Sequence, residues 1–294
     1  MTLKQPLTLA AIGLLPALTG CLTHTRIVPK TRVADVIIST SLDTMANQLA
    51  TRYDAMQTFN AGVEISATTG GGLQGKEVQT LSFAGYILMR KPEFLRVLLL
   101  VPVVRTQALD LVSDGQNFKL YIPPRKRAIV GSNTLTTTSK NGLENLRPDV
   151  FFDSMFIQGP EQDEIMSMTT DIRVIESGKK KQDLIEEPAY ALQILKRPEG
   201  TQARTLRVIH INSTDLLPYQ QDIYDKDGHV VTKAYYSNYT YYGTTPYPSK
   251  IIIERPRDHY SLTVLITKLA LNGHFDDDQF ELKIPEGIAI ETLK

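Results

Sequence analysis

The 294-residue chain contains no tryptophan, only one cysteine and no net charge. A single cysteine excludes an intrachain disulfide, so packing must supply the stability, and the chain is long enough for one sizeable core. The 32 basic and 32 acidic residues balance, which argues against nucleic acid as the main partner because phosphate binding needs an excess of Lys and Arg. The longest apolar run falls short of the roughly 20 residues that a membrane-spanning helix requires.

The lone cysteine, Cys21, ends an apolar segment near the N-terminus. Lys4 precedes the run PLTLAAIGLLPALTG, whose last residues before the cysteine are Leu-Thr-Gly. This pattern is typical of a bacterial lipoprotein signal, in which residues 1–20 are cleaved and Cys21 carries acyl chains. A secretory peptide with a bystander cysteine, or a buried thiol, is the alternative. We expect residues 21–34 to form a tether and residues 35–294 to form the folded domain.

The segment after the tether has the spacing of an amphipathic helix. Its apolar residues recur every three or four positions at Ile38, Leu42, Met45, Leu49, Tyr53 and Met56, as one helical face requires.

Short runs rich in β-branched and aromatic residues follow and predict strands. We place them near 61–69, 77–91, 94–101, 104–112, 116–122, 126–130, 170–176, 189–197, 203–212, 218–225, 229–242, 249–255 and 260–271. Turns such as Asp114-Gly115 separate them, without the residues for helical crossovers, so one antiparallel sheet is expected. Alternation gives this sheet one apolar face that includes Leu95, Val97, Leu99, Leu109, Leu111, Phe118 and Leu120.

A second, short helix is predicted to start at Pro148. Val150, Phe151, Ser154 and Met155 would share one side of it, with Phe152 and Phe156 on an adjoining line. A helix this apolar is normally buried against a sheet. It would be either ordinary core or a lid over a cavity, and periodicity alone leaves both open.

Motifs for catalysis or metal binding are weak. The five histidines lack metal-ligand spacing, no G-x-S-x-G supplies a nucleophile, and Asp276–Asp278 lacks the spaced oxygens of a calcium loop. The stretch TGGGLQGKE at 69–77 departs from a phosphate-binding loop at Glu77, where Ser or Thr is required. We expect no metal, no cofactor and no enzyme activity, although a hydrolase with a dispersed site stays open.

Three stretches make the chain resemble the LolA-like family of periplasmic lipoprotein carriers. They are GYILMRKPEFLRV at 85–97, LVSDGQNFKLYIPP at 111–124 and DDQFELKIPEGIAI at 277–290. The resemblance implies a mainly β fold, an incomplete antiparallel β-barrel (half-barrel) whose concave face is covered by an N-terminal helix and a short lid helix.

The resemblance also implies positions for a ligand cavity and a latch. Ile87, Met89, Leu95, Val97 and Leu99 would face the cavity, with Leu109, Leu111, Phe118 and Leu120 continuing its wall. Lys91 stands where the soluble carrier has a latching arginine, and the lid would present Phe151, Phe152, Met155 and Phe156.

The sequence therefore predicts a lipid-anchored protein of the bacterial cell envelope that faces the periplasm, at the outer membrane. It would bind acyl chains or lipidated protein without covalent chemistry, with the membrane as partner through acylated Cys21 and an envelope protein as a further partner. A structural or interaction lipoprotein with a filled core is the alternative.

Overall fold

The computed structural model describes residues 26, 28, 30–34, 36–71, 75–134, 146–176 and 184–293. The expected signal peptide and Cys21 lie outside the described residues. No helix within these ranges is long and apolar enough to cross a membrane.

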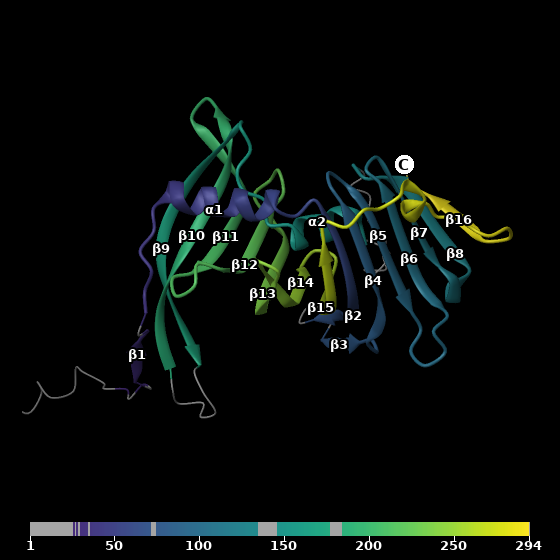
Figure 1. Ribbon diagram of the computed structural model, residues 1–294, viewed down its shortest axis with the longest axis horizontal. Coiled ribbons are helices and arrows are strands. Elements are labelled where there is room, and N and C mark those ends of the chain that lie inside the picture. Colours follow the sequence, from purple (N-terminus) through teal and green to yellow (C-terminus); the bar gives the residue numbers. More distant parts are fainter. Residues whose placement is uncertain are drawn as a thin grey trace, which may run out of the picture.

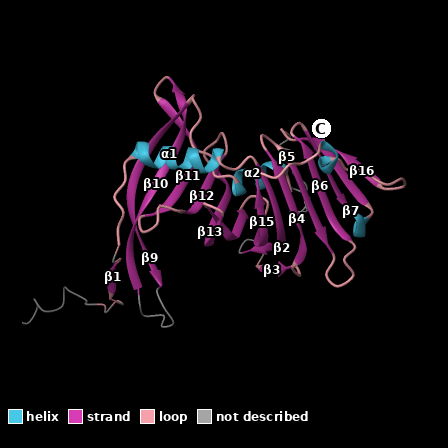
Figure 2. Cartoon of the chain, viewed as in Figure 1, coloured by secondary structure: helices cyan, strands magenta, loops and turns pink. Residues whose placement is uncertain are grey.

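The described part of the chain forms one large sheet with two α-helices on a single face (Figures 1 and 2). In its first half the elements are β1 (Thr31–Val33), α1 (Leu42–Asp54), β2 (Thr58–Gly71), β3 (Lys76–Gln79), β4 (Phe83–Arg90), β5 (Phe94–Leu100), β6 (Gln107–Asp114), β7 (Asn117–Ile122) and β8 (Arg127–Ser132). The second half contains α2 (Pro148–Met155), β9 (Glu164–Glu176), β10 (Leu184–Glu199), β11 (Gln202–Asn212), β12 (Pro218–Tyr224), β13 (Val230–Tyr242), β14 (Thr245–Arg255), β15 (Tyr260–Leu271) and β16 (Ala289–Thr292).

Two hairpin series build the sheet, and β15 joins them by pairing with β2. The strand order is β1-β10-β11-β12-β13-β14-β15-β2-β4-β5-β6-β7-β8-β16, with β9 paired to β10 and β3 to β2. The sheet stays open, which confirms the predicted half-barrel class. We call the face that carries α1 and α2 the inner face.

The sheet differs from the expected all-antiparallel arrangement at its edges. β1 pairs with β10 and β16 pairs with β8, both in parallel. These short strands come from the two ends of the chain and reach their partners over long connections, which a hairpin rule does not anticipate. The last residues of the expected tether, Thr31–Val33, are thus part of the sheet.

Several other boundaries differ from the sequence prediction; for example, β9 begins at Glu164 and β10 at Leu184, where strands were predicted from 170 and 189. The expected strand at 77–91 divides into β3 and β4, because β3 pairs only with the part of β2 that extends beyond β4. Helix α1 begins at Leu42, four residues after Ile38, since the Ser41 hydroxyl accepts a hydrogen bond from the Thr44 amide (3.2 Å) and so caps the helix there.

Each helix covers its own part of the inner face. Met45 and Leu49 of α1 pack on β10 and β11, where Leu192, Ile194 and Ile209 are fully buried. Helix α2 packs on the middle of the sheet through Val150, Phe151 and Met155 (Figure 1). The prediction that Val150, Phe151, Ser154 and Met155 share a buried side is confirmed.

Near the C-terminus, part of the outer face is also covered. There a 3₁₀ helix at Asp277–Phe280 places Phe280 against Val112, together with Phe275 and Leu282. This small third cluster also includes the half-buried rings of Phe94 and Tyr121.

Candidate functional site

Most of the expected cavity residues are packed core. Seven of the nine are at most 1 % exposed: Ile87, Met89, Leu95, Val97, Leu111, Phe118 and Leu120. They form one apolar cluster with the buried side of α2. Beneath α2, therefore, the inner face is filled.

Three of the nine, the buried Val97 together with Leu99 and Leu109, line an open space of about 250 Å³ at one end of the same face. We call it the apolar cavity. Its walls come from β2, β4, β5, β6 and β15, from the turn after β7, and from Leu146 and Phe151. The lining residues are Ile65, Ala67, Thr80, Phe83, Val97, Leu99, Val101, Ala108, Leu109, Ile122, Pro124, Arg125, Leu146, Phe151 and Leu262.

The walls of the apolar cavity contain little polarity. Thr80 and Arg125 are the hydrogen-bonding side chains among the described lining residues, and the Thr80 hydroxyl already accepts from the Ala67 amide (2.8 Å). Sequence reasoning missed the contribution of β2, although Ala61, Val63, Ile65 and Ala67 alternate in the manner of an inner face.

Two exposed apolar residues are close in sequence to residues that line the cavity. Leu81 follows the lining residue Thr80 and is 75 % exposed, and Val103, two residues after the lining residue Val101, is 96 % exposed. Val103 also has a φ of 69°, in the left-handed region that β-branched residues avoid. An exposed valine held in this conformation is a candidate for function.

Helix α2, the expected lid, is firmly attached at its C-terminal end. The hydroxyl groups of Tyr236 and Tyr247 donate to the carbonyl oxygens of Ser154 (2.9 Å) and Met155 (2.8 Å). These carbonyls belong to the last turn of the helix, which lacks partners of its own. Phe151 and Met155 are buried, and Phe156 is 4 % exposed.

Lys91, the expected latch, contacts α1 rather than the body of α2. Its ammonium donates to the Tyr53 carbonyl oxygen and lies 3.2 Å from the centre of the Tyr53 ring. Its contact with the lid region is the Phe156 ring, whose centre is 5.3 Å away. Burial lowers the Lys91 pKa to about 8, and the nearby Asp54 opposes this shift.

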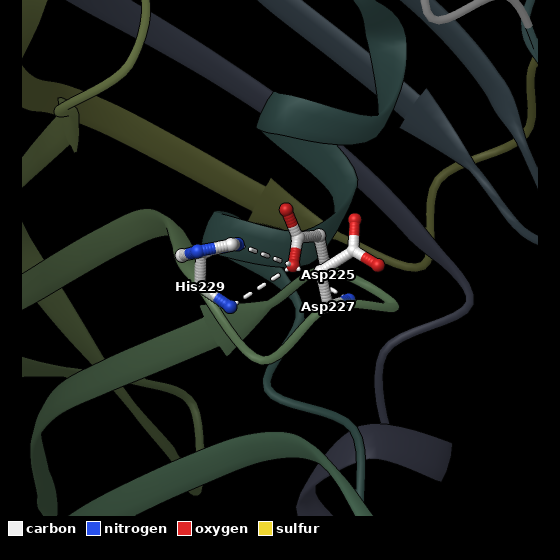
Figure 3. Close-up of side chains that lie close together, drawn as sticks. All are labelled: Asp225, Asp227 and His229. Atoms are coloured by element: carbon white, nitrogen blue, oxygen red, sulfur yellow. Dashed lines mark hydrogen bonds and ion pairs between the residues drawn. The ribbon is translucent and has the colours of Figure 1, made fainter.

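Among the residues that the structure describes, one group of possible metal ligands occurs that the sequence patterns did not indicate. Asp225, Asp227 and His229 gather at the β12–β13 turn (Figure 3), with ligand atoms within 4.8 Å of one another. Asp225 already accepts from the backbone amides of Asp227 and His229 (both 2.9 Å) and from Arg257 (2.5 Å). The arrangement is that of an aspartate-stabilised turn, and the D-x-D-x-H spacing was its only signal in the sequence.

Among known proteins, this chain is similar in architecture to several solved structures. No family model and no curated protein match the sequence. A LolA superfamily protein from Nitrosomonas europaea is 16 % identical with a TM-score of 0.47, over 81 % of this chain and 97 % of that chain. A DUF1329 family protein from Desulfovibrio piger ATCC 29098 is 15 % identical with a TM-score of 0.49, over 81 % of this chain and 95 % of that chain. At these values the likeness is one of general fold.

Proposed function

We propose that the protein binds acyl chains, of a lipid or of a lipidated protein, in the apolar cavity, as a lipid-anchored component of the bacterial envelope. The observation that carries the proposal is an open space of about 250 Å³ whose walls are almost entirely aliphatic and aromatic. Binding would need no covalent step.

The size and polarity of the cavity suit this ligand. An apolar cavity of about 150 Å³ stays dry and takes up a small hydrocarbon, so a larger one lined in the same way favours part of an acyl chain. Each buried methylene contributes roughly 0.8 kcal/mol. With two polar side chains in the described walls, a polar ligand would leave its own groups unpaired.

A membrane is the natural source of such a ligand. Leu81 and Val103 expose apolar side chains beside the cavity lining, where they can enter the edge of a bilayer. Acylation of Cys21 would keep the protein at the membrane, because two or more acyl chains anchor stably whereas one holds only marginally. Periplasmic exposure and an outer-membrane location belong to this proposal.

The proposal is tested by filling the cavity. Ala67 lies on the inner face of β2, is 7 % exposed and lines the cavity, so Ala67→Phe would place a ring in that space. A fluorescent fatty acid should then bind at least about tenfold more weakly, the equivalent of about two lost methylenes.

Ala84→Phe is the matched control. Ala84 lies on the same face of β4 as the exposed Tyr86 and does not line the cavity. This variant should leave fatty-acid binding unchanged. Equal binding by the parent and the Ala67 variant, with both folded, would contradict the proposal.

A structural lipoprotein with a filled core is the second candidate. The six buried residues that do not line the cavity favour it. If the parent protein fails to bind the fatty acid at all, this second function is the one that remains.

A further inference from the structure

A second hollow, of about 320 Å³, lies on the side of α2 that faces away from the core. Its walls come from α2, the end of α1, the β4–β5 and β6–β7 turns, the end of β8, and β11 and β12. We call it the acidic hollow. It is distinct from the apolar cavity, whose contact with α2 is Phe151.

Helix α2 contributes one complete face to the acidic hollow. Asp149, Phe152, Asp153 and Phe156 all line it. Asp149, Phe152 and Asp153 lie along the less buried side of α2, and the buried Phe156 follows directly after the helix. Two carboxylates one turn apart therefore flank an aromatic ring inside a concave space.

Negative charge exceeds positive charge in the described lining. Glu93 adds a third carboxylate, and Arg207 supplies the one cationic side chain. Arg207 is already bonded to Glu164 Oε2 (2.9 Å) and to the Gly159 carbonyl (2.8 Å). The hollow thus holds a surplus of acceptor charge.

The charges around the two aspartates do not remove this surplus. Arg255 and Arg147 favour the charged form of Asp149, but Arg255 also donates to Asp258 (2.9 Å) and Thr232 (2.8 Å). Both aspartates are open to water within the hollow. Carboxylates held together in this way favour a bound cation.

A buried acceptor in the wall also lacks a donor. Gln221 is 2 % exposed and lines the hollow, and its Nε2 donates to the Asp153 carbonyl (2.7 Å). Its Oε1 is buried without a hydrogen-bond partner in the described chain. A ligand that donates a hydrogen bond would pair this acceptor.

We propose that the acidic hollow binds an organic ammonium group. Asp149 and Asp153 would supply the opposing charge, and the Phe152 ring would receive the alkyl substituents and the cation on its face. The apolar rings favour an alkylammonium over a hydrated metal ion, which gains nothing from them. The ammonium belongs either to a lipid headgroup or to a free amine.

Titration calorimetry with choline, ethanolamine and the neutral carbon analogue of choline tests the proposal. Choline and ethanolamine, which both carry a positive charge, should bind. The neutral analogue should bind at least about tenfold more weakly than choline, since it lacks the charge that the carboxylates and the ring attract. Equal binding of choline and its neutral analogue, or no binding of either amine, would overturn the proposal.

Isosteric variants locate the site. Asp149→Asn combined with Asp153→Asn keeps the shape of the hollow and should weaken choline binding by about tenfold or more. Asp171→Asn is the control, because Asp171 is an exposed acid on β9 outside the hollow. Unchanged choline binding in the folded double variant would refute the assignment.

A short-chain phosphatidylethanolamine, used below its micelle concentration, separates the two sources when it is titrated into the Ala67→Phe variant, in which the apolar cavity is filled and cannot take up the acyl chains. Tighter binding than free ethanolamine supports a lipid headgroup, and equal binding supports a free amine. Equal binding of a short-chain phosphatidylglycerol, which lacks the amine, would overturn the ammonium assignment. Ala67→Phe should not affect choline binding, so failure here and failure of the acyl-chain proposal are distinguishable.

Discussion

At Lys91 the chain holds a charged amine in a half-buried position between α1 and the β4–β5 turn. The ammonium gains the Tyr53 carbonyl and the Tyr53 ring as partners, yet its pKa falls from 10.5 to about 8. Loss of hydration therefore outweighs these contacts and the attraction of Asp54. The contact joins the end of α1 to the sheet, so its state of charge affects how that end is held.

The lowered pKa predicts a pH dependence of stability. Between about pH 8 and pH 10.5 the unfolded chain binds more protons at Lys91 than the folded chain, so the free energy of unfolding should rise with pH in this window. In Lys91→Met this contribution is absent. Urea denaturation of both proteins across the window gives the comparison, and a difference that stays constant with pH would contradict the prediction.

At the scale of elements, α2 depends on tyrosines from two neighbouring strands. Tyr236 of β13 and Tyr247 of β14 are buried and satisfy carbonyls of its last turn. Both belong to the stretch at 235–247, which is rich in tyrosine. Tyr239 also donates inward, to the Pro218 carbonyl (2.7 Å), whereas Tyr241 is 70 % exposed. Several tyrosines of the stretch thus have a structural role.

Removing both helix-capping hydroxyls should loosen α2. Tyr236→Phe with Tyr247→Phe leaves two buried carbonyls without these donors, which should lower the free energy of unfolding by about 1 to 3 kcal/mol. Tyr241→Phe is the matched control and should have no effect, because its side chain is exposed. Urea denaturation measures both, and a double variant as stable as the control would argue against the capping role.

At the scale of the whole molecule, the C-terminal segment returns to cover the outer face of β5 and β6. Beneath it, Arg96 forms two hydrogen bonds with the fully buried Asp110 (2.8 and 3.1 Å) and donates to the Gln279 carbonyl (3.1 Å). Burial raises the pKa of Asp110, and Arg96 opposes that shift. One arginine therefore neutralises a buried acid and fastens the end of the chain.

Removing one partner of the Arg96–Asp110 pair should lower the free energy of unfolding strongly, whereas replacing both partners by apolar residues should lower it little. Arg96→Met leaves Asp110 buried without its cation and should lower the free energy of unfolding by about 3 to 5 kcal/mol. Adding Asp110→Leu should restore most of the loss, because two apolar side chains replace the pair. Denaturant unfolding of the single and double variants decides the matter, and a single variant with parental stability would show that the pair contributes little.

Local patterns in the sequence were sufficient to predict much of the fold. Alternation from Phe94 to Val101 predicted which side chains of β5 face inward, because successive side chains of a strand point to opposite faces. Pro148 and the apolar spacing after it predicted α2 and its buried side. The edge strands β1 and β16 escaped prediction, since three or four residues carry no readable period and parallel pairing depends on distant partners.

The sequence by itself determined the inner-facing residues of the predicted strands, because a period of two leaves no choice once a strand forms. Only the tertiary structure decided what lies over them. Leu95 is packed core and Leu99 lines a cavity, although both belong to β5 and have the same parity. Helix α2 covers one part of the face and leaves the other open. Its position depends on contacts with β13 and β14, about 80 to 90 residues further along the chain, and side-chain packing at that separation leaves no periodic signal in a local stretch of sequence.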